Sequence, residues 1–194
     1  MRRAKMLGVM IACAGLALSA CSDADGDTTG SNTAGETRDM SNSTLAEAIA
    51  DIDRLSIMAD AMTRTGLVGV LEGEANYTVL APTDAAFEEA SEQLAQAMGS
   101  EADGAIAAAV LREHMVPGAL DPASIREAIK NSGGEATIAN FGAGTITFSL
   151  DGDTIVARSG EGPEASATSD VIITTNGVLI PVDAVLINAD SIPG

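Results

Sequence analysis

The chain has very few aromatic residues, few basic residues and a single histidine. Its 194 residues contain no tryptophan, one tyrosine and three phenylalanines, and 28 acidic residues against ten lysines and arginines give a net charge of −18. A chain this acidic is repelled by nucleic-acid phosphates, and it lacks the aromatic side chains on which unpaired bases stack. These shortages exclude nucleic acid as a partner.

Cysteine is also scarce, and this limits how the chain is stabilised. Cys13 and Cys21 are the only cysteines. Cys13 lies in an apolar run at residues 6–18, which follows three basic residues and is too short to span a bilayer as a stable helix. A basic start followed by such a run is typical of a secretory signal peptide. An exported chain that keeps only one cysteine has no internal disulfide, so its stability must come from its core.

The sequence LSAC at residues 18–21 resembles the lipobox of bacterial lipoproteins. In that family the signal peptide is cleaved before the cysteine, which receives the lipid. The resemblance implies a signal peptide at residues 1–20 and lipid attachment at Cys21. The mature net charge is then about −21, because residues 1–20 hold three basic residues and no acidic one. An ordinary signal peptide with an incidental cysteine is the alternative.

The residue after Cys21 bears on the location of the protein. In enterobacterial lipoproteins an aspartate at that position retains the protein in the inner membrane, whereas here the residue is Ser22. The resemblance therefore implies a protein of the bacterial cell envelope that is anchored by lipid in the outer membrane. It does not distinguish the periplasmic face of that membrane from the surface face.

Residues 21–43 are polar and acidic, and such a segment cannot bury enough apolar surface to fold. As a flexible linker of roughly 20 residues it has a root-mean-square reach of about 25 Å. The stretch DADGD at residues 23–27 looks like a fragment of a calcium-binding loop. Its glycine is misplaced for such a loop and the bidentate glutamate is missing, so we expect an acidic flexible tether that holds no metal.

Residues 44–190 have the length of one domain and can bury a proper core. The hydrophobic period is helical in the first half and alternating in the second, which predicts helices followed by strands. Thr44 and Glu47 form a capping-box pattern at the first helix, and Gly66 is a natural left-handed stop for the second. The predicted helices are residues 44–52, 55–65, 84–98, 100–113 and 121–130, and the predicted strands include residues 136–140, 145–150 and 153–159.

Two turns divide the strands of the second half. Asp151 and Gly152 form a hairpin dipeptide, and turn chemistry accounts for Asp151 and Asp153 better than a metal site does. The last apolar block, residues 170–188, predicts a strand, an Asn-Gly turn, a second strand interrupted at Pro181, and a third strand.

The stretch YTVLAPTDAAF at residues 77–87 predicts a corner at which a buried strand leads directly into a helix. Pro82 ends the strand because it cannot donate a hydrogen bond to the ladder. Thr83 or Asp84 offers a side-chain oxygen to the first free N–H groups of the helix. Phe87 then packs back onto the core that the strand covers.

Three segments together resemble the fasciclin-like domain family. The corner at residues 77–87 looks like the first fasciclin signature, with Leu80 in place of the usual phenylalanine. LREHMVPGAL at residues 111–120 is similar to the central segment of the family, and TNGVLIPVDAVL at residues 175–186 is similar to the second signature. The three segments occur in the order and spacing of the family.

The resemblance implies an α+β fold, a bent wedge of about seven β-strands with a packed layer of helices. It also marks signature positions that have a structural or an interaction role: Thr78, Ala81, Pro82, Thr83, Asp84, Phe87, His114, Pro117, Gly118, Asn176, Gly177 and Asp183.

Two positions depart from the family pattern. Glu113 stands where the family commonly has tyrosine, and that tyrosine with the following histidine is implicated in adhesion among animal members. The departure argues against adhesion of that particular kind. Pro181 stands where histidine or tyrosine often precedes the valine of the second signature, and a proline there predicts an edge or a bend in the strand.

His114 is the only histidine, and three roles compete for it. A catalytic base requires a nucleophile and an orienting acid, and no such set can be named from the sequence. A metal ligand requires cysteine or further histidine partners, which are absent. We therefore expect a structural, partly buried imidazole that hydrogen-bonds a polar group of the nearby corner, Thr83 or Asp84.

The sequence favours a non-enzymatic binding or adhesion module that needs no cofactor. Such a module is lipid-anchored, held off the membrane by its tether and presented to an envelope or extracellular protein or polysaccharide. The alternative is a carrier of an apolar small molecule, a pigment or a lipid, in the periplasm. A pocket lined by methionines of the helices, Met58, Met62 or Met98, would favour the carrier. No constellation of residues supports an enzyme.

Overall fold

The computed structural model describes residues 37–90, 92–99, 104–142, 144–160, 162–168 and 170–187. The predicted signal peptide, Cys21 and the predicted tether as far as residue 36 lie outside these residues. Within them the chain forms the expected α+β fold, with nine strands in two sheets where the resemblance implied about seven.

The strands are β1 (Thr37–Met40), β2 (Tyr77–Pro82), β3 (Met115–Pro117), β4 (Ala136–Ala139), β5 (Thr145–Asp151), β6 (Thr154–Ser159), β7 (Glu164–Ser166), β8 (Val171–Thr174) and β9 (Gly177–Val182). The helices are α1 (Leu45–Ala50), α2 (Ser56–Thr65), α3 (Val68–Leu71), α4 (Asp84–Glu89), α5 (Glu92–Gly99), α6 (Gly104–Glu113) and α7 (Pro122–Asn131), with a 3₁₀ turn, η1 (Asp53–Leu55), before α2.

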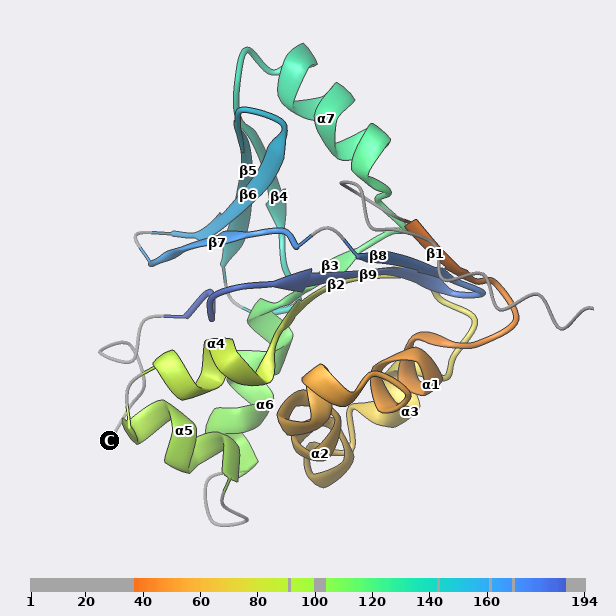
Figure 1. The fold of residues 1–194 in the computed structure, drawn as a ribbon, viewed down its shortest axis with the longest axis vertical. Helices are drawn as coiled ribbons and strands as arrows, with labels where there is room; N and C mark the ends of the chain where they lie inside the picture. The colour runs from red at the N-terminus through yellow and green to blue at the C-terminus, as the bar shows by residue number, and fades with distance from the viewer. Residues whose placement is uncertain are drawn as a thin grey trace, which may run out of the picture. The chain divides into compact units, whose positions relative to one another are not determined.

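The five-stranded sheet lies between two layers. Its strand order is β1-β8-β9-β2-β3, and the central strands β2 and β9 run parallel. Figure 1 shows helices α1 to α6 against one face of this sheet, and the second sheet with α7 against the other. All six residues of β9 are buried, because the strand is covered on both faces. That is why the end of the sequence carries an unbroken apolar run instead of an alternating one.

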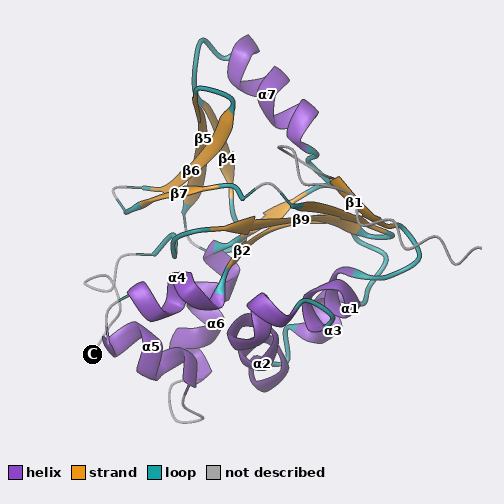
Figure 2. Ribbon diagram, viewed as in Figure 1, coloured by secondary structure: helices purple, strands orange, loops and turns teal. Residues whose placement is uncertain are grey.

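Each face of the central sheet has its own hydrophobic core. Val79 of β2 and Leu179 of β9 face the helices, where they pack with Met58, Phe87 and other buried side chains. The neighbouring side chains along the same strands point the opposite way, toward β4 to β7 and α7. Figure 2 shows the helices on one side of the central sheet and the second sheet with α7 on the other side. The alternation follows from the two-residue repeat of a strand.

Several helix ends form where the sequence predicts them. The Thr44 side chain accepts from the N–H of Glu47, and the Glu47 carboxylate accepts from the N–H of Thr44 over 2.7 Å, so the predicted capping box is present. Gly66 ends α2 in the left-handed conformation, with φ of 73°. Asp121 caps α7 by accepting from the N–H of Ser124 over 2.7 Å. The predicted hairpin also forms between β5 and β6, but its two turn residues are Gly152 and Asp153, because Asp151 still pairs with Thr154.

The predicted helix at residues 84–98 is wrong, because the chain forms two helices there. Ala90 is extended, with φ of −69° and ψ of 170°, and ends α4. Phe87 in α4 and Leu94 and Met98 in α5 are all buried, so both helices keep the same apolar spacing. Because the helical spacing of apolar residues continues across Ala90, the sequence pattern does not indicate the break between the two helices.

The predicted tether extends too far, because residues 37–40 form β1. This strand pairs parallel with β8, with Thr37 opposite Val171 and Met40 opposite Thr174. Main-chain hydrogen bonds hold an edge strand without requiring an apolar composition. The polar sequence TRDM therefore gives no sign of it.

The predicted interruption at Pro181 is also wrong. The strand β9 continues through Pro181 to Val182, and Pro181 lies opposite Ala81 of β2. On the other side of β9, the pairing with β8 ends before Pro181. The carbonyl oxygen of Pro181 instead accepts from the N–H of Thr168 over 2.8 Å. Proline is tolerated there because no ladder partner needs its missing N–H. The segment after β9, as far as residue 187, contains no strand, so the third predicted strand is absent.

Candidate functional site

The predicted corner between strand and helix is present. The strand β2 ends at Pro82, and Thr83 caps α4 by accepting from the N–H of Ala86 over 3.3 Å. Ala81, before the proline, is fully buried, and Phe87 is 1% exposed in the core under the helices. These positions build the joint between the central sheet and α4, and they present no side chain for chemistry.

Asp84 does not cap its own helix but caps a different one. Its carboxylate accepts from the hydroxyl of Ser56 over 2.7 Å and from the N–H of Ile57 over 2.9 Å. These groups belong to the first turn of α2, whose own preceding residue makes no side-chain cap. A carboxylate at a helix N-terminus is stabilised by the free N–H groups and by the helix dipole. Asp84 therefore ties α4 to α2.

Thr78 holds the turn that follows β3. Its hydroxyl donates to the carbonyl oxygen of Gly118 over 2.6 Å and accepts from the N–H of Leu120 over 2.8 Å. Gly118 has φ of 93°, which glycine adopts at little steric cost. Pro117, which is exposed, lies opposite Tyr77 at the end of β3. The first signature and the central segment are thus joined through one buried hydroxyl.

His114 is a buried link between α6 and the end of the domain. Its Nε2 accepts from the N–H of Leu186 over 3.0 Å, so the proton of the neutral ring lies on Nδ1, which donates to the carbonyl oxygen of Val110 over 2.7 Å. The expected partners, Thr83 or Asp84, are wrong, because main-chain groups occupy both ring nitrogens.

The surroundings of His114 keep the imidazole uncharged. Burial lowers the pKa of His114 from its ordinary 6.5 to about 4, against the opposing effects of the Val110 carbonyl and the Glu113 carboxylate. A proton on Nε2 would also oppose the N–H of Leu186, donor against donor. With both nitrogens occupied and the ring 1% exposed, His114 is not placed to move a substrate proton.

Asn176 and Gly177 form the tightest joint of the second signature. The Asn176 Oδ1 accepts from the N–H of Leu45 over 2.8 Å, and its Nδ2 donates to the carbonyl oxygens of Leu71 and Gly73 over 2.6 and 2.9 Å. One buried amide thus joins the starts of α1 and β9 to the end of α3. A Cβ at Gly177 would overlap the carbonyl oxygen of Tyr77, so only glycine fits there.

Asp183 completes the second signature just beyond β9. Its carboxylate accepts from the N–H of Ser166 over 2.6 Å, and its own N–H donates to the carbonyl oxygen of the same residue over 3.2 Å. This pair of bonds joins the end of the central strand to β7 in the second sheet. Asp183 therefore serves the packing of the two sheets.

Glu113, the departure from the family pattern, holds the loop between β4 and β5. Its carboxylate accepts from the amide of Asn140 and from the hydroxyl of Ser159. The Asn140 side chain also accepts from the N–H of Gly144 over 3.1 Å, and a Cβ at Gly142 would overlap the Glu113 carboxylate. The glutamate thus lies directly on a glycine-containing loop, and no pattern in the sequence indicates that contact.

This loop presents the most exposed aromatic side chain among the described residues. Phe141 is 42% exposed, and its ring meets that of Tyr77 edge to face with centroids 5.2 Å apart. The N–H of Phe141 donates to the carbonyl oxygen of Met115 over 2.8 Å, which fixes the loop to β3. Two of the four aromatic residues of the chain therefore form a surface pair instead of a core pair.

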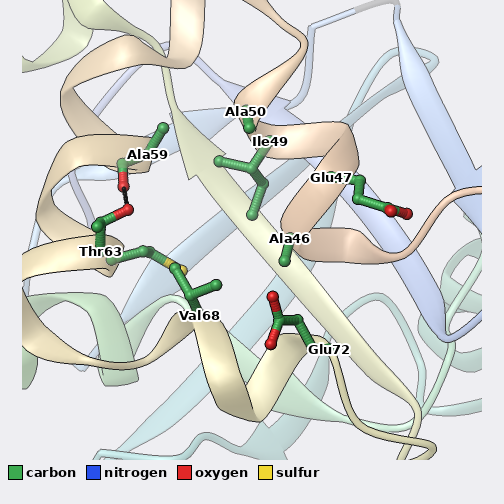
Figure 3. Close-up of a pocket in the computed structure, with 9 residues that line it drawn as sticks. Ala46, Glu47, Ile49, Ala50, Ala59, Thr63, Val68 and Glu72 are labelled. Atoms are coloured by element: carbon green, nitrogen blue, oxygen red, sulfur yellow. Dashed lines mark hydrogen bonds between the residues drawn. The ribbon is translucent and has the colours of Figure 1, made fainter.

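A pocket of about 210 Å³ opens between α1, α2 and α3. Figure 3 shows its lining, which comes from all three helices: Ala46, Glu47, Ile49, Ala50, Ala59, Met62, Thr63, Val68 and Glu72. Of the three methionines suggested for a pocket, only Met62 lines it, although all three are buried in the core. The short helix α3 was not predicted, so the sequence alone gave no sign of this pocket.

Two kinds of site are missing from the part of the chain that the structure describes. No group of three or more His, Cys, Asp or Glu side chains there is arranged to hold a metal ion. No helix there is both long and apolar enough to cross a membrane.

Comparison with known proteins agrees with this architecture. The family model of the Fasciclin domain matches residues 53–188. The chain belongs to the Fasciclin domain family. No curated protein matches the sequence. Among solved structures, the FAS1 domain pair of the insect cell adhesion molecule fasciclin I is similar, with a TM-score of 0.67 and 10% identity over 79% of this chain and 53% of that one.

The match to the insect protein shows the fold alone, because the identity is so low. The chain spans about half the length of that domain pair. Fasciclin domains are generally binding modules without enzymatic activity, so family membership suggests adhesion or binding. In this Fasciclin domain the buried signature residues, Thr78, His114 and Asn176 among them, build internal joints. These buried residues therefore present no surface for binding.

Proposed function

We propose that this Fasciclin domain is a non-enzymatic binding or adhesion module of the bacterial cell envelope. The observation that carries the proposal is the state of His114, whose two ring nitrogens are both bonded to main-chain groups within the core. The other polar signature side chains make similar internal bonds. A domain whose polar signature groups are used in this way offers a surface for binding instead of a catalytic centre.

The proposed attachment is a lipid at Cys21. The lipobox-like sequence before Cys21 supports it, and the first strand of the domain, β1, begins only at Thr37. A flexible segment of this length reaches roughly 20–25 Å, enough to hold the domain clear of a membrane surface. By the same resemblance the anchored protein belongs to the outer membrane, on its periplasmic or its surface face.

The proposed partner is a protein or polysaccharide of the envelope or of the cell exterior. Four large apolar side chains are exposed among the described residues: Val70, Phe141, Leu150 and Ile173. Phe141 is the strongest contact candidate of the four, because the Glu113 and Met115 contacts hold its loop in place before any partner binds. A preorganised side chain loses less conformational entropy on binding.

A carrier of an apolar small molecule is the second candidate, and the pocket between α1, α2 and α3 is the observation that favours it. Its volume of about 210 Å³ lies below the 300–1,000 Å³ usual for drug-sized ligands. A carotenoid-sized pigment or a whole lipid does not fit that volume. A carrier built on this pocket is therefore limited to a short apolar group.

Two experiments on the full chain separate these functions. Native mass spectrometry of the purified protein should show the mature, lipid-modified chain with no further ligand if it is an adhesion module, and an additional non-covalent ligand if it is a carrier. In a second experiment, a photo-crosslinking residue is placed in turn at Val70, Phe141, Leu150 and Ile173 in living cells. We expect a discrete crosslinked product from the Phe141 position and no product from the Leu150 position. A bound ligand together with no product at any position would contradict the adhesion module.

A further inference from the structure

The pocket between α1, α2 and α3 has apolar walls and an open mouth. Ile49 and Met62 are buried and form its inner walls, and Ala46, Ala59 and Val68 are partly buried around them. The remaining lining residues are exposed, so the pocket opens to solvent. Its volume of about 210 Å³ suits a short, unbranched side chain better than a drug-sized ligand.

Two carboxylates lie at the pocket, and one of them already serves as a helix cap. Glu47 accepts from the N–H and the hydroxyl of Thr44 as part of the capping box of α1. The Glu72 carboxylate has no hydrogen-bond or ion-pair partner among the described residues. Figure 3 shows it directed at the pocket, between Ala46 and Val68, whereas the Glu47 carboxylate points away.

We infer that this pocket takes the side chain of a lysine of a partner protein. The four methylenes of lysine match the apolar walls, and its ammonium group reaches Glu72 at the mouth, since a lysine buries its stem along apolar surface and leaves its charge at the edge. Charge favours the same occupant, because a chain with 28 acidic residues against ten basic ones attracts cations and repels anions. The inference rests on the proposed function, in which a protein is the partner.

Met62 provides a direct signal for occupancy. In the full chain labelled with ¹³C at the methionine methyl groups, the Met62 resonance reports on the pocket, while those of Met98 and Met115 report on the core away from it. Three probes are titrated: Nα-acetyl-lysine-N-methylamide, the norleucine analogue that lacks the ammonium group, and n-butylammonium. We expect the lysine probe to shift Met62 saturably and to bind about fivefold more tightly than norleucine, the upper range for an exposed ion pair.

Substitutions at the mouth and on the wall separate charge from shape. Glu72→Gln should remove the preference for lysine over norleucine and leave norleucine binding unchanged. Glu74→Gln removes another exposed carboxylate that does not line the pocket, and should change nothing. Ala50→Leu, at an exposed position on the wall, should fill the pocket and abolish the Met62 shift for every probe. All three positions are exposed, so the variants should keep the fold.

The possible outcomes either support or overturn the inference. Equal binding of lysine and norleucine would make this an apolar site and overturn it. Tighter binding of n-butylammonium than of capped lysine would assign the pocket to a free amine and overturn the choice of a protein side chain. No shift at Met62 would overturn it as well, yet a crosslinked partner at Phe141 would leave the adhesion module standing, so the two proposals fail separately.

Discussion

The main-chain N–H of Leu186 donates to Nε2 of His114 over 3.0 Å, and this bond joins two parts of the chain that lie 72 residues apart. The same ring donates from Nδ1 to the carbonyl oxygen of Val110. The only histidine of the protein therefore fastens the segment after β9 to α6. This use of both nitrogens requires the neutral form of the ring.

Stability should fall on mild acidification because of His114. Its pKa is about 4 in the folded domain and 6.5 when unfolded, so the unfolded state binds more protons between these values. The contribution is complete above pH 6.5 and is lost as the pH falls toward 4, at a total cost of about 3 kcal/mol. Urea denaturation at a series of pH values measures it.

His114→Gln provides the control for this pH dependence. Glutamine offers one acceptor and one donor, but not in the imidazole geometry, so the variant should be less stable at pH 7. Its unfolding free energy should be nearly flat between pH 6.5 and about 5, above the range in which most carboxylates titrate. Equal slopes for wild type and variant in that window would show that His114 is not held neutral.

Phe87→Ala should destabilise the domain by about 3–5 kcal/mol, the usual cost of deleting a buried aromatic side chain. Phe87 is 1% exposed at the corner between β2 and α4. Phe141→Ala is the matched control, since that ring is 42% exposed and should cost less than about 1 kcal/mol. Comparable losses in the two denaturant melts would mean that the corner does not anchor the core.

Asn176→Ala should cost about 3 kcal/mol or more. The substitution leaves the buried N–H of Leu45 and the buried carbonyl oxygen of Leu71 without their partner, and each such group costs about 1–3 kcal/mol. The partly buried bond to the carbonyl oxygen of Gly73 is lost as well. Asn131→Ala, at an exposed position at the end of α7, is the control and should change little. Thermal and urea unfolding of both variants tests whether one amide joins α1, α3 and β9.

Gly177→Ala should destabilise the domain by at least about 2 kcal/mol, because its Cβ would overlap the carbonyl oxygen of Tyr77 in the neighbouring strand. Gly69→Ala in α3 meets no atom within 4 Å and should be neutral or slightly stabilising. A tolerated alanine at Gly177 would place β2 and β9 farther apart at this point than the structure does.

Local chemistry made much of this fold predictable from the sequence. The capping box at Thr44, the left-handed stop at Gly66 and the corner at Thr83 each depend on residues within a few positions of one another, and each is present. The resemblance to the fasciclin-like family implied the α+β class, and the hydrophobic period, which changes from helical to alternating along the chain, agrees with it.

The remaining features depend on contacts between distant residues, and local patterns do not show these. The N-terminus of α2 is capped by Asp84, 28 residues beyond Ser56. The carboxylate of Glu113 lies on a loop that begins at Asn140. The pocket requires α3, a helix of only four residues with too few positions to show a period. For the same reason the sequence predicted a structural histidine but named the wrong partners for it.

The central claim, that this Fasciclin domain is a module anchored in the cell envelope through Cys21, is tested most directly by fractionation. Wild type and Cys21→Ala are expressed in a diderm bacterial host with labelled palmitate, and the envelope is separated into its membranes. More than one acyl chain is needed for a lasting hold on a bilayer, and the acidic chain offers no electrostatic attraction to anionic lipid. We expect labelled wild type in the outer-membrane fraction, and unlabelled Cys21→Ala as soluble protein or uncleaved precursor. Unlabelled wild type that is freely soluble in the periplasm would contradict the anchor.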